Sequence, residues 1–115
     1  MINRAAVMLK YKAPAVQWIN EADPHKDDPG ISLEEVNQER TVYLVHDSAA
    51  ETGNVDAWVK SNWRALFERE LEGWYTVEEL WPPKLSLSLF KSWFTVECHT
   101  IVEDTSDAPL FDEDI

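Results

Sequence analysis

The residues best suited to chemistry lie in "TVECHTIVED", residues 95–104. A thiol beside an imidazole, as in Cys98 and His99, can form a nucleophile–base pair. If this segment is a strand, however, adjacent side chains point to opposite faces, so His99 cannot activate Cys98. Cys98 shares its parity with Phe94 and Val96, and we expect it to be a small buried hydrophobe.

The other parity of the same segment carries Glu97, His99 and Glu103. Two carboxylates and an imidazole can hold a divalent metal, and His46 lies near the end of another expected strand. The alternative is a solvated sheet face, on which His and Glu side chains need no ligand. We expect no bound metal, with Glu97, His99 and His46 as the best candidates if one is present.

Motifs for other chemistry are missing from the sequence. The three glycines are isolated, and there is no phosphate-binding glycine loop, nucleophile elbow, His-Glu-x-x-His zinc motif or dinucleotide-binding fingerprint. Asp23, Asp27 and Asp28 lie around a turn, which aspartates favour, and lack the ligand pattern of a calcium loop. We therefore expect no catalytic residue and no cofactor.

The net charge of −12 is concentrated towards the end of the chain, where residues 94–115 hold seven acids and no Lys or Arg. Such a chain repels phosphate backbones and anionic membranes, so we expect no nucleic-acid or membrane partner. A protein partner is expected, and the charge favours a basic one. The single cysteine and the lack of about 20 consecutive apolar residues predict a soluble cytoplasmic protein.

Periodicity predicts the elements that position these residues. Apolar residues recur every three or four positions over residues 54–73, which predicts one long helix. Strands are expected at about 4–12, 41–47 and 94–103, and short helices near 14–22, 33–36 and 86–93. The run "TVYLVHD", residues 41–47, is almost continuously apolar, which predicts a central strand covered on both faces. The fold class is therefore α+β: a domain over residues 1–103 with about three strands in one sheet, one long helix and two or three short ones, followed by an acidic tail at 104–115.

Sequence signals also predict the ends of these helices. Two capping-box patterns and two helix-end residues are present: Ser32 with Glu35, Thr76 with Glu79, Asn54 as an N-cap, and Gly73 as a left-handed C-terminal residue.

The turn "EGWYTVEELWPPK", residues 72–84, concentrates aromatic side chains. We expect Trp74 and Trp81 to fold back as a hydrophobic clasp, with Tyr75 the most exposed of the group. In the tail, Leu110 and Phe111 interrupt the acids and can anchor it to this domain or to a neighbouring molecule. The candidate partner-binding residues are Tyr75, Trp81, Leu110 and Phe111.

A set of short segments runs through the chain: "NRAAVMLKYKAPAVQWI", "ADP", "TVYL", "EGWY", "LWP" and "FKSWF". Together they resemble an uncharacterised family of small bacterial proteins, over most of residues 3–104. The resemblance implies a bacterial cytoplasmic origin and no assigned activity, and it does not extend to the tail after Asp104.

These observations favour a small acidic, non-enzymatic protein-interaction module, an accessory or adaptor protein. Two alternatives remain open. One is a small metal-binding protein or enzyme that uses Glu97, His99 and His46. The other is a DNA mimic, whose acidic surface inhibits a basic nucleic-acid-binding protein.

Overall fold

The computed structural model describes residues 1–25, 29–51 and 53–112. Over these residues three strands form one antiparallel sheet: β1 (Arg4–Tyr11), β2 (Val42–His46) and β3 (Phe94–His99). The strand order is β2-β1-β3, so β1 is central and pairs with both neighbours. The same residues form four α-helices, which confirms the predicted α+β class.

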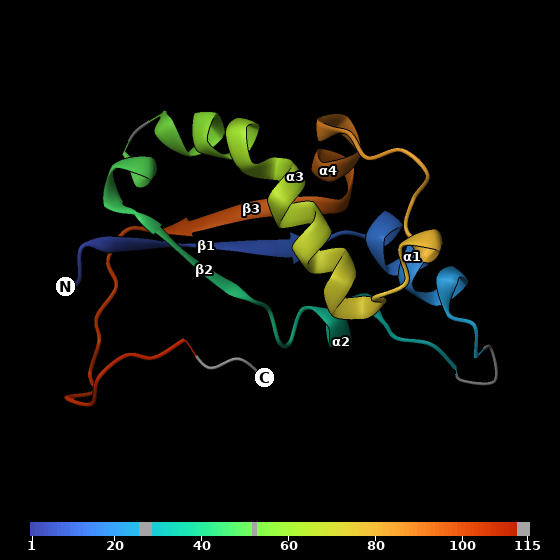
Figure 1. Ribbon diagram of the computed structural model, residues 1–115, viewed down its shortest axis with the longest axis horizontal. Coiled ribbons are helices and arrows are strands. Elements are labelled where there is room, and N and C mark those ends of the chain that lie inside the picture. Colours follow the sequence, from blue (N-terminus) through green and yellow to red (C-terminus); the bar gives the residue numbers. More distant parts are fainter. Residues whose placement is uncertain (26–28, 52, 113–115) are drawn as a thin grey trace.

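The long helix, α3, spans Asn54–Trp74, and Figure 1 shows it passing across the sheet. The three shorter helices are α1 (Ala13–Ala22), α2 (Leu33–Val36) and α4 (Leu87–Trp93). Two 3₁₀ turns, Asp47–Ala50 and Glu78–Leu80, precede and follow α3. Pro14 lies in the first turn of α1, where its missing N–H costs no helical hydrogen bond.

The inner face of the sheet builds the core. Val7, Leu9 and Tyr11 of β1 alternate towards the helices and are buried. Behind them Phe67 of α3 is 0% exposed, and its ring lies 5.8 Å from that of Phe90, with edge-on contacts to Trp93 and Phe94. The core is therefore an aromatic cluster that joins α3 to α4 and to the start of β3.

The position predicted for the strand at 41–47 is wrong. This strand lies at the edge of the sheet, and Val42 and Leu44 on its outer face are 52% and 47% exposed. They are paired with Met8 and Ala6, so they share the sheet face that no helix fills. A short run of apolar residues is compatible with a central strand covered on both faces and also with an edge strand whose outer apolar residues are uncovered. The run at 41–47 therefore did not distinguish the two positions.

The third strand is shorter than predicted. It ends at His99 rather than near residue 103, and residues 100–112 form neither helix nor strand. Two contacts hold the start of the tail beside the N-terminus: the Ile2 amide donates to the Val102 carbonyl at 2.8 Å, and the terminal ammonium meets Glu103 at 2.7 Å.

Helix α3 begins and ends differently from the prediction. Its N-cap is Gly53, whose φ of 83° suits glycine, while the side-chain amide of Asn54 donates to the Ser48 carbonyl at 2.9 Å. Gly73 stays inside the helix, and Tyr75 ends it with extended backbone angles.

The two capping-box predictions had opposite outcomes. Ser32 and Glu35 form the reciprocal pair of hydrogen bonds at the start of α2. Thr76 and Glu79 do not, because the short 3₁₀ turn there starts after Val77 and has no side-chain cap. Three residues of 3₁₀ turn do not place the capping side chains as a first α-helical turn does.

Candidate functional site

Cys98 and His99 lie as the strand periodicity predicts. Cys98 is paired with Val7 and is half-buried, in contact with the small apolar cluster that contains Ala5 and Val45. His99 is exposed on the other face. The two side chains therefore do not form a nucleophile–base pair.

The candidate metal ligands are not brought together. His46 on β2 and His99 on β3 flank the central strand, opposite Arg4 and Ala6 respectively. Glu97 accepts a hydrogen bond at 2.6 Å from Arg40, which holds the pKa of that carboxyl below its usual range. Within residues 1–25, 29–51 and 53–112, no three His, Cys, Asp or Glu side chains converge on a possible metal position. The turn candidates Asp27 and Asp28 lie outside the described residues.

Among these same residues, no helix combines the length and the apolar composition that crossing a bilayer requires.

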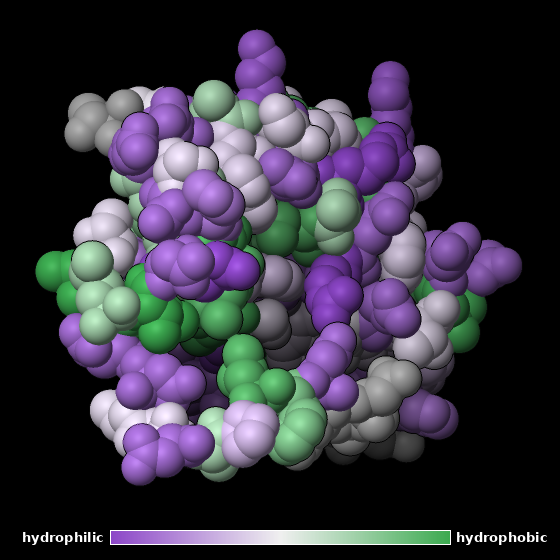
Figure 2. All heavy atoms as spheres, turned by 60° about the vertical axis from the view of Figure 1, so that its left-hand side comes forward, coloured by the Kyte–Doolittle hydropathy of each residue, from purple (hydrophilic) through white to green (hydrophobic). Residues whose placement is uncertain are grey.

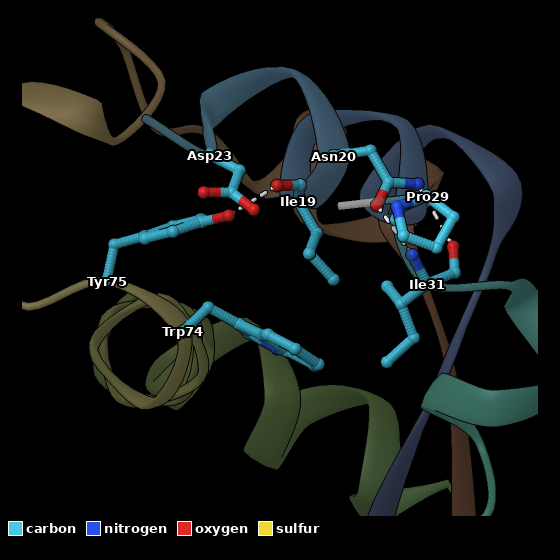
Figure 3. A pocket seen from close by; sticks show the side chains of 8 residues that line it. Ile19, Asn20, Asp23, Pro29, Ile31, Trp74 and Tyr75 are labelled. Carbon is cyan, nitrogen blue, oxygen red and sulfur yellow. Dashed lines mark hydrogen bonds between the residues drawn. The ribbon is translucent and has the colours of Figure 1, made fainter. Parts of the chain in front are cut away.

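A cavity of about 380 Å³ lies between the end of α1, the segment 29–31 and the end of α3. Figure 3 shows Ile19 pointing towards the ring of Trp74 across it, with Tyr75 and Asp23 at one side. Asn20 closes the other side, since its amide both accepts from and donates to the backbone of Ile31, at 2.8 and 3.0 Å.

Two aromatic side chains of the turn 72–84, Tyr75 at the cavity and Trp81 outside its lining, use their polar atoms within the chain. Tyr75 is half-buried, and its hydroxyl donates to the Ile19 carbonyl. Burial, together with the Asp23 carboxylate, raises the pKa of that hydroxyl. Trp81 is also half-buried and donates from its indole to the Tyr75 carbonyl at 2.7 Å. These contacts close the turn 72–84 onto α1.

A cluster of hydrogen-bonded polar side chains joins the sheet to α3. Glu70 accepts hydrogen bonds from the hydroxyls of Tyr11, at 2.7 Å, and Tyr43, and the Trp74 indole donates to the Tyr11 hydroxyl at 2.9 Å. Burial is the main cause that raises the pKa of both tyrosines, and the Glu70 carboxylate raises it further. The sequence does not reveal this cluster, because its members lie far apart along the chain and no local pattern links them.

Another hollow, of about 330 Å³, runs between β2 and α3. We call it the β2–α3 groove. Five consecutive residues, Thr41 to Val45, form one wall. The helix wall consists of Trp58, Asn62, Ala65, Leu66 and Arg69. Since alternate residues of a strand face opposite sides, a hollow lined by five consecutive ones lies at the strand's edge.

The edge that faces this groove is open. Among the strands of the described residues, β2 pairs only with β1, so every second residue of β2 directs its N–H and C=O groups away from the sheet. Apart from the pairing with β1, no described residue makes a backbone hydrogen bond to Val42–Val45. The groove therefore combines unpaired backbone groups with the apolar side chains of Trp58 and Leu66.

The charge of the groove differs from that of the whole chain. Its lining contains Arg69 and no acid, although the chain holds 22 acids and 10 bases. Arg69 is exposed and forms no ion pair with any described residue. Figure 2 shows hydrophobic side chains reaching one face of the molecule in patches between hydrophilic ones.

The four residues predicted to bind a partner lie in two separate places. Tyr75 and Trp81 are in direct contact, whereas Leu110 and Phe111 are exposed in the tail and line neither hollow. The groove residues were missed because the strand 41–47 was expected to be central. One feature of the sequence does indicate an edge strand: β2 is short and lies between the charged residues Arg40 and Asp47, as edge strands often do.

No family model, no curated protein and no solved structure matches this chain. The resemblance to a small bacterial family therefore stays a prediction, and the site must be interpreted from its own geometry.

Proposed function

We propose that this protein is a non-enzymatic interaction module that binds an extended segment of a partner protein along the free edge of β2. One observation carries the proposal: the unpaired edge of β2 opens into a groove whose second wall is a regular face of α3. Addition of a strand to such an edge is a common mode of peptide recognition.

The two walls have different tasks in this mode of binding. The backbone of Val42–Val45 supplies a ladder of hydrogen bonds that holds any extended segment. Alternate side chains of the bound segment then enter the groove against Trp58 and Leu66, which selects apolar residues. The remaining side chains lie towards the open face beside Leu44, 47% exposed.

The local charge indicates which segments fit. Net charge alone favours a basic partner, but Arg69 is the only charged residue of the groove lining. An apolar segment with an acidic residue near one end therefore fits best, because the acid can pair with Arg69 while no acidic wall repels it. The metal-binding and DNA-mimic hypotheses remain predictions, and no contact among the described residues adds support to either.

Selection of peptides from a random display library tests this function, with the immobilised full chain as bait. We expect enrichment of extended apolar–acidic peptides that bind the Ala65→Glu variant at least about tenfold more weakly, since the longer side chain obstructs the groove and its carboxylate pairs with Arg69, four residues along α3, in place of the peptide's acid. Ala65 is exposed, so its replacement leaves the core unchanged.

The matched control is Ala57→Glu, which makes the same replacement at an exposed position of α3 outside the groove. It should bind the selected peptides as the native chain does. Peptides that bind both variants equally, or a library that yields no binder, would contradict the proposal.

A further inference from the structure

We propose that residues 107–112 of a second copy of this chain occupy the β2–α3 groove, so that two molecules exchange their acidic tails in a symmetric dimer. This inference rests on the proposed function of the groove and names its occupant.

The tail has the features of an unpartnered strand. Its described part after Val102 forms neither helix nor strand, and Leu110 and Phe111 are 82% and 73% exposed. Two adjacent apolar side chains exposed to this extent gain free energy when a groove covers them. The segment therefore consists of two apolar residues flanked by acidic ones, and this is the composition that fits the groove.

The dimensions of segment and groove agree. Five residues of strand extend over about 17 Å, and the six residues 107–112 over about 20 Å. Pro109 has no N–H, but an added edge strand tolerates a proline whose nitrogen points away from the ladder. The adjacent residues Leu110 and Phe111 point to opposite sides of the strand, so one enters the groove and the other covers the open face near Leu44.

The charges agree as well. Asp107 and Asp112 lie on either side of the apolar pair, and Arg69 is the groove residue that has no ion-pair partner among those described. One aspartate of the docked tail can therefore pair with Arg69. This contact fixes the register of the segment more than it adds affinity, because exposed ion pairs are worth little.

The occupant is a second copy rather than the same molecule because the two surfaces do not meet within one chain. Leu110 and Phe111 are exposed, and no tail residue up to Asp112 lines the groove. The start of the tail is held beside the N-terminus by the Ile2–Val102 hydrogen bond and the Met1–Glu103 ion pair. Reciprocal exchange places two tails in two grooves, so each contact strengthens the other.

Sedimentation of the full chain tests this inference at about 0.15 M salt, where repulsion between two acidic molecules is screened beyond about 8 Å. From about 1 to 200 μM, a range that includes micromolar dissociation constants, we expect a monomer–dimer equilibrium. The variant Leu110→Ser/Phe111→Ser should raise the dissociation constant at least about tenfold, as should Ala65→Glu.

Two control variants should keep the dimer. Ile101→Ser changes an apolar side chain that is 71% exposed but lies outside the docking segment, and Ala57→Glu changes α3 outside the groove. A native chain that stays monomeric throughout, or a dimer that survives the Leu110→Ser/Phe111→Ser change, would overturn the inference.

A peptide of residues 104–112, added to the full Leu110→Ser/Phe111→Ser chain, separates this inference from the proposed function. Binding that Ala65→Glu abolishes, together with a dimeric native chain, supports both. If the peptide binds in the same way but the native chain is monomeric, a second copy is not the occupant, and the proposed function of the groove still holds. If this peptide fails to bind while display-selected peptides bind, the tail is the wrong occupant. If neither the tail peptide nor any display-selected peptide binds, both this inference and the proposed function are wrong.

Discussion

Replacing Phe67 by alanine is expected to lower the free energy of unfolding by about 3–5 kcal/mol. Phe67 is 0% exposed, and its ring packs edge-on against Phe90, Trp93 and Phe94. Truncation therefore removes the contacts by which α3 holds α4 and the start of β3, and leaves a cavity between rigid rings that cannot close easily. Chemical denaturation, followed by tryptophan fluorescence, measures the loss.

The chain provides a matched control in Phe111, which is 73% exposed. Phe111→Ala should change the free energy of unfolding by no more than about 0.5 kcal/mol when measured at a concentration too low for association. A loss below about 1 kcal/mol for Phe67→Ala, with the fold intact, would contradict the aromatic core described above.

The second large effect is a loss of stability at alkaline pH. Burial and the Glu70 carboxylate raise the pKa of Tyr11 and Tyr43 above the ordinary value of about 10. These hydroxyls stay protonated in the folded chain, while those of the unfolded chain ionise near pH 10. Their contribution is therefore fully present below pH 10 and is lost as the pH rises above it, by about 1.4 kcal/mol per pH unit for Tyr11 and less for the more exposed Tyr43.

Denaturation at a series of pH values from about 8 to 11.5 measures this slope, and the phenolate absorbance reports the ionisation. In Tyr11→Phe the loss per pH unit should be smaller than in the native chain, whatever the stability of the variant at neutral pH. Equal slopes in the two proteins, or ionisation of all three tyrosines near pH 10 without unfolding, would contradict the Glu70 cluster.

Local patterns predicted the elements of this fold because each pattern depends on residues close in sequence. The three- and four-residue recurrence from Val55 to Trp74 predicted α3 to within a residue or two, and the Ser32–Glu35 capping box marked α2. The end of β3 was missed because residues 100–103 continue the alternation of the strand after the pairing with β1 has ended at His99. Alternation indicates where a strand is possible, whereas the partner strand decides how far it extends.

The candidate site depends on long-range pairing, which the sequence does not show. Val42 and Leu44 have the same apolar pattern in a central strand as in an edge strand, so the groove could not be foreseen without the order β2-β1-β3. The aromatic turn was easier to recognise, because Tyr75 and Trp81 lie close in sequence and do meet. Its polar atoms, however, bond to α1 and to the turn itself, and no sequence pattern indicates those partners.

Both proposals depend on the binding of an extended segment along the free edge of β2. The most direct measurement is an amide NMR titration of the full Leu110→Ser/Phe111→Ser chain, which removes the proposed competition from the tail, with a display-selected peptide. We expect shift changes at Thr41–Val45 and on the groove face of α3 around Ala65, with slower hydrogen exchange at the outward amides of β2. Shifts confined to the cavity beside Tyr75 or to the open sheet face, with no change along β2, would contradict it.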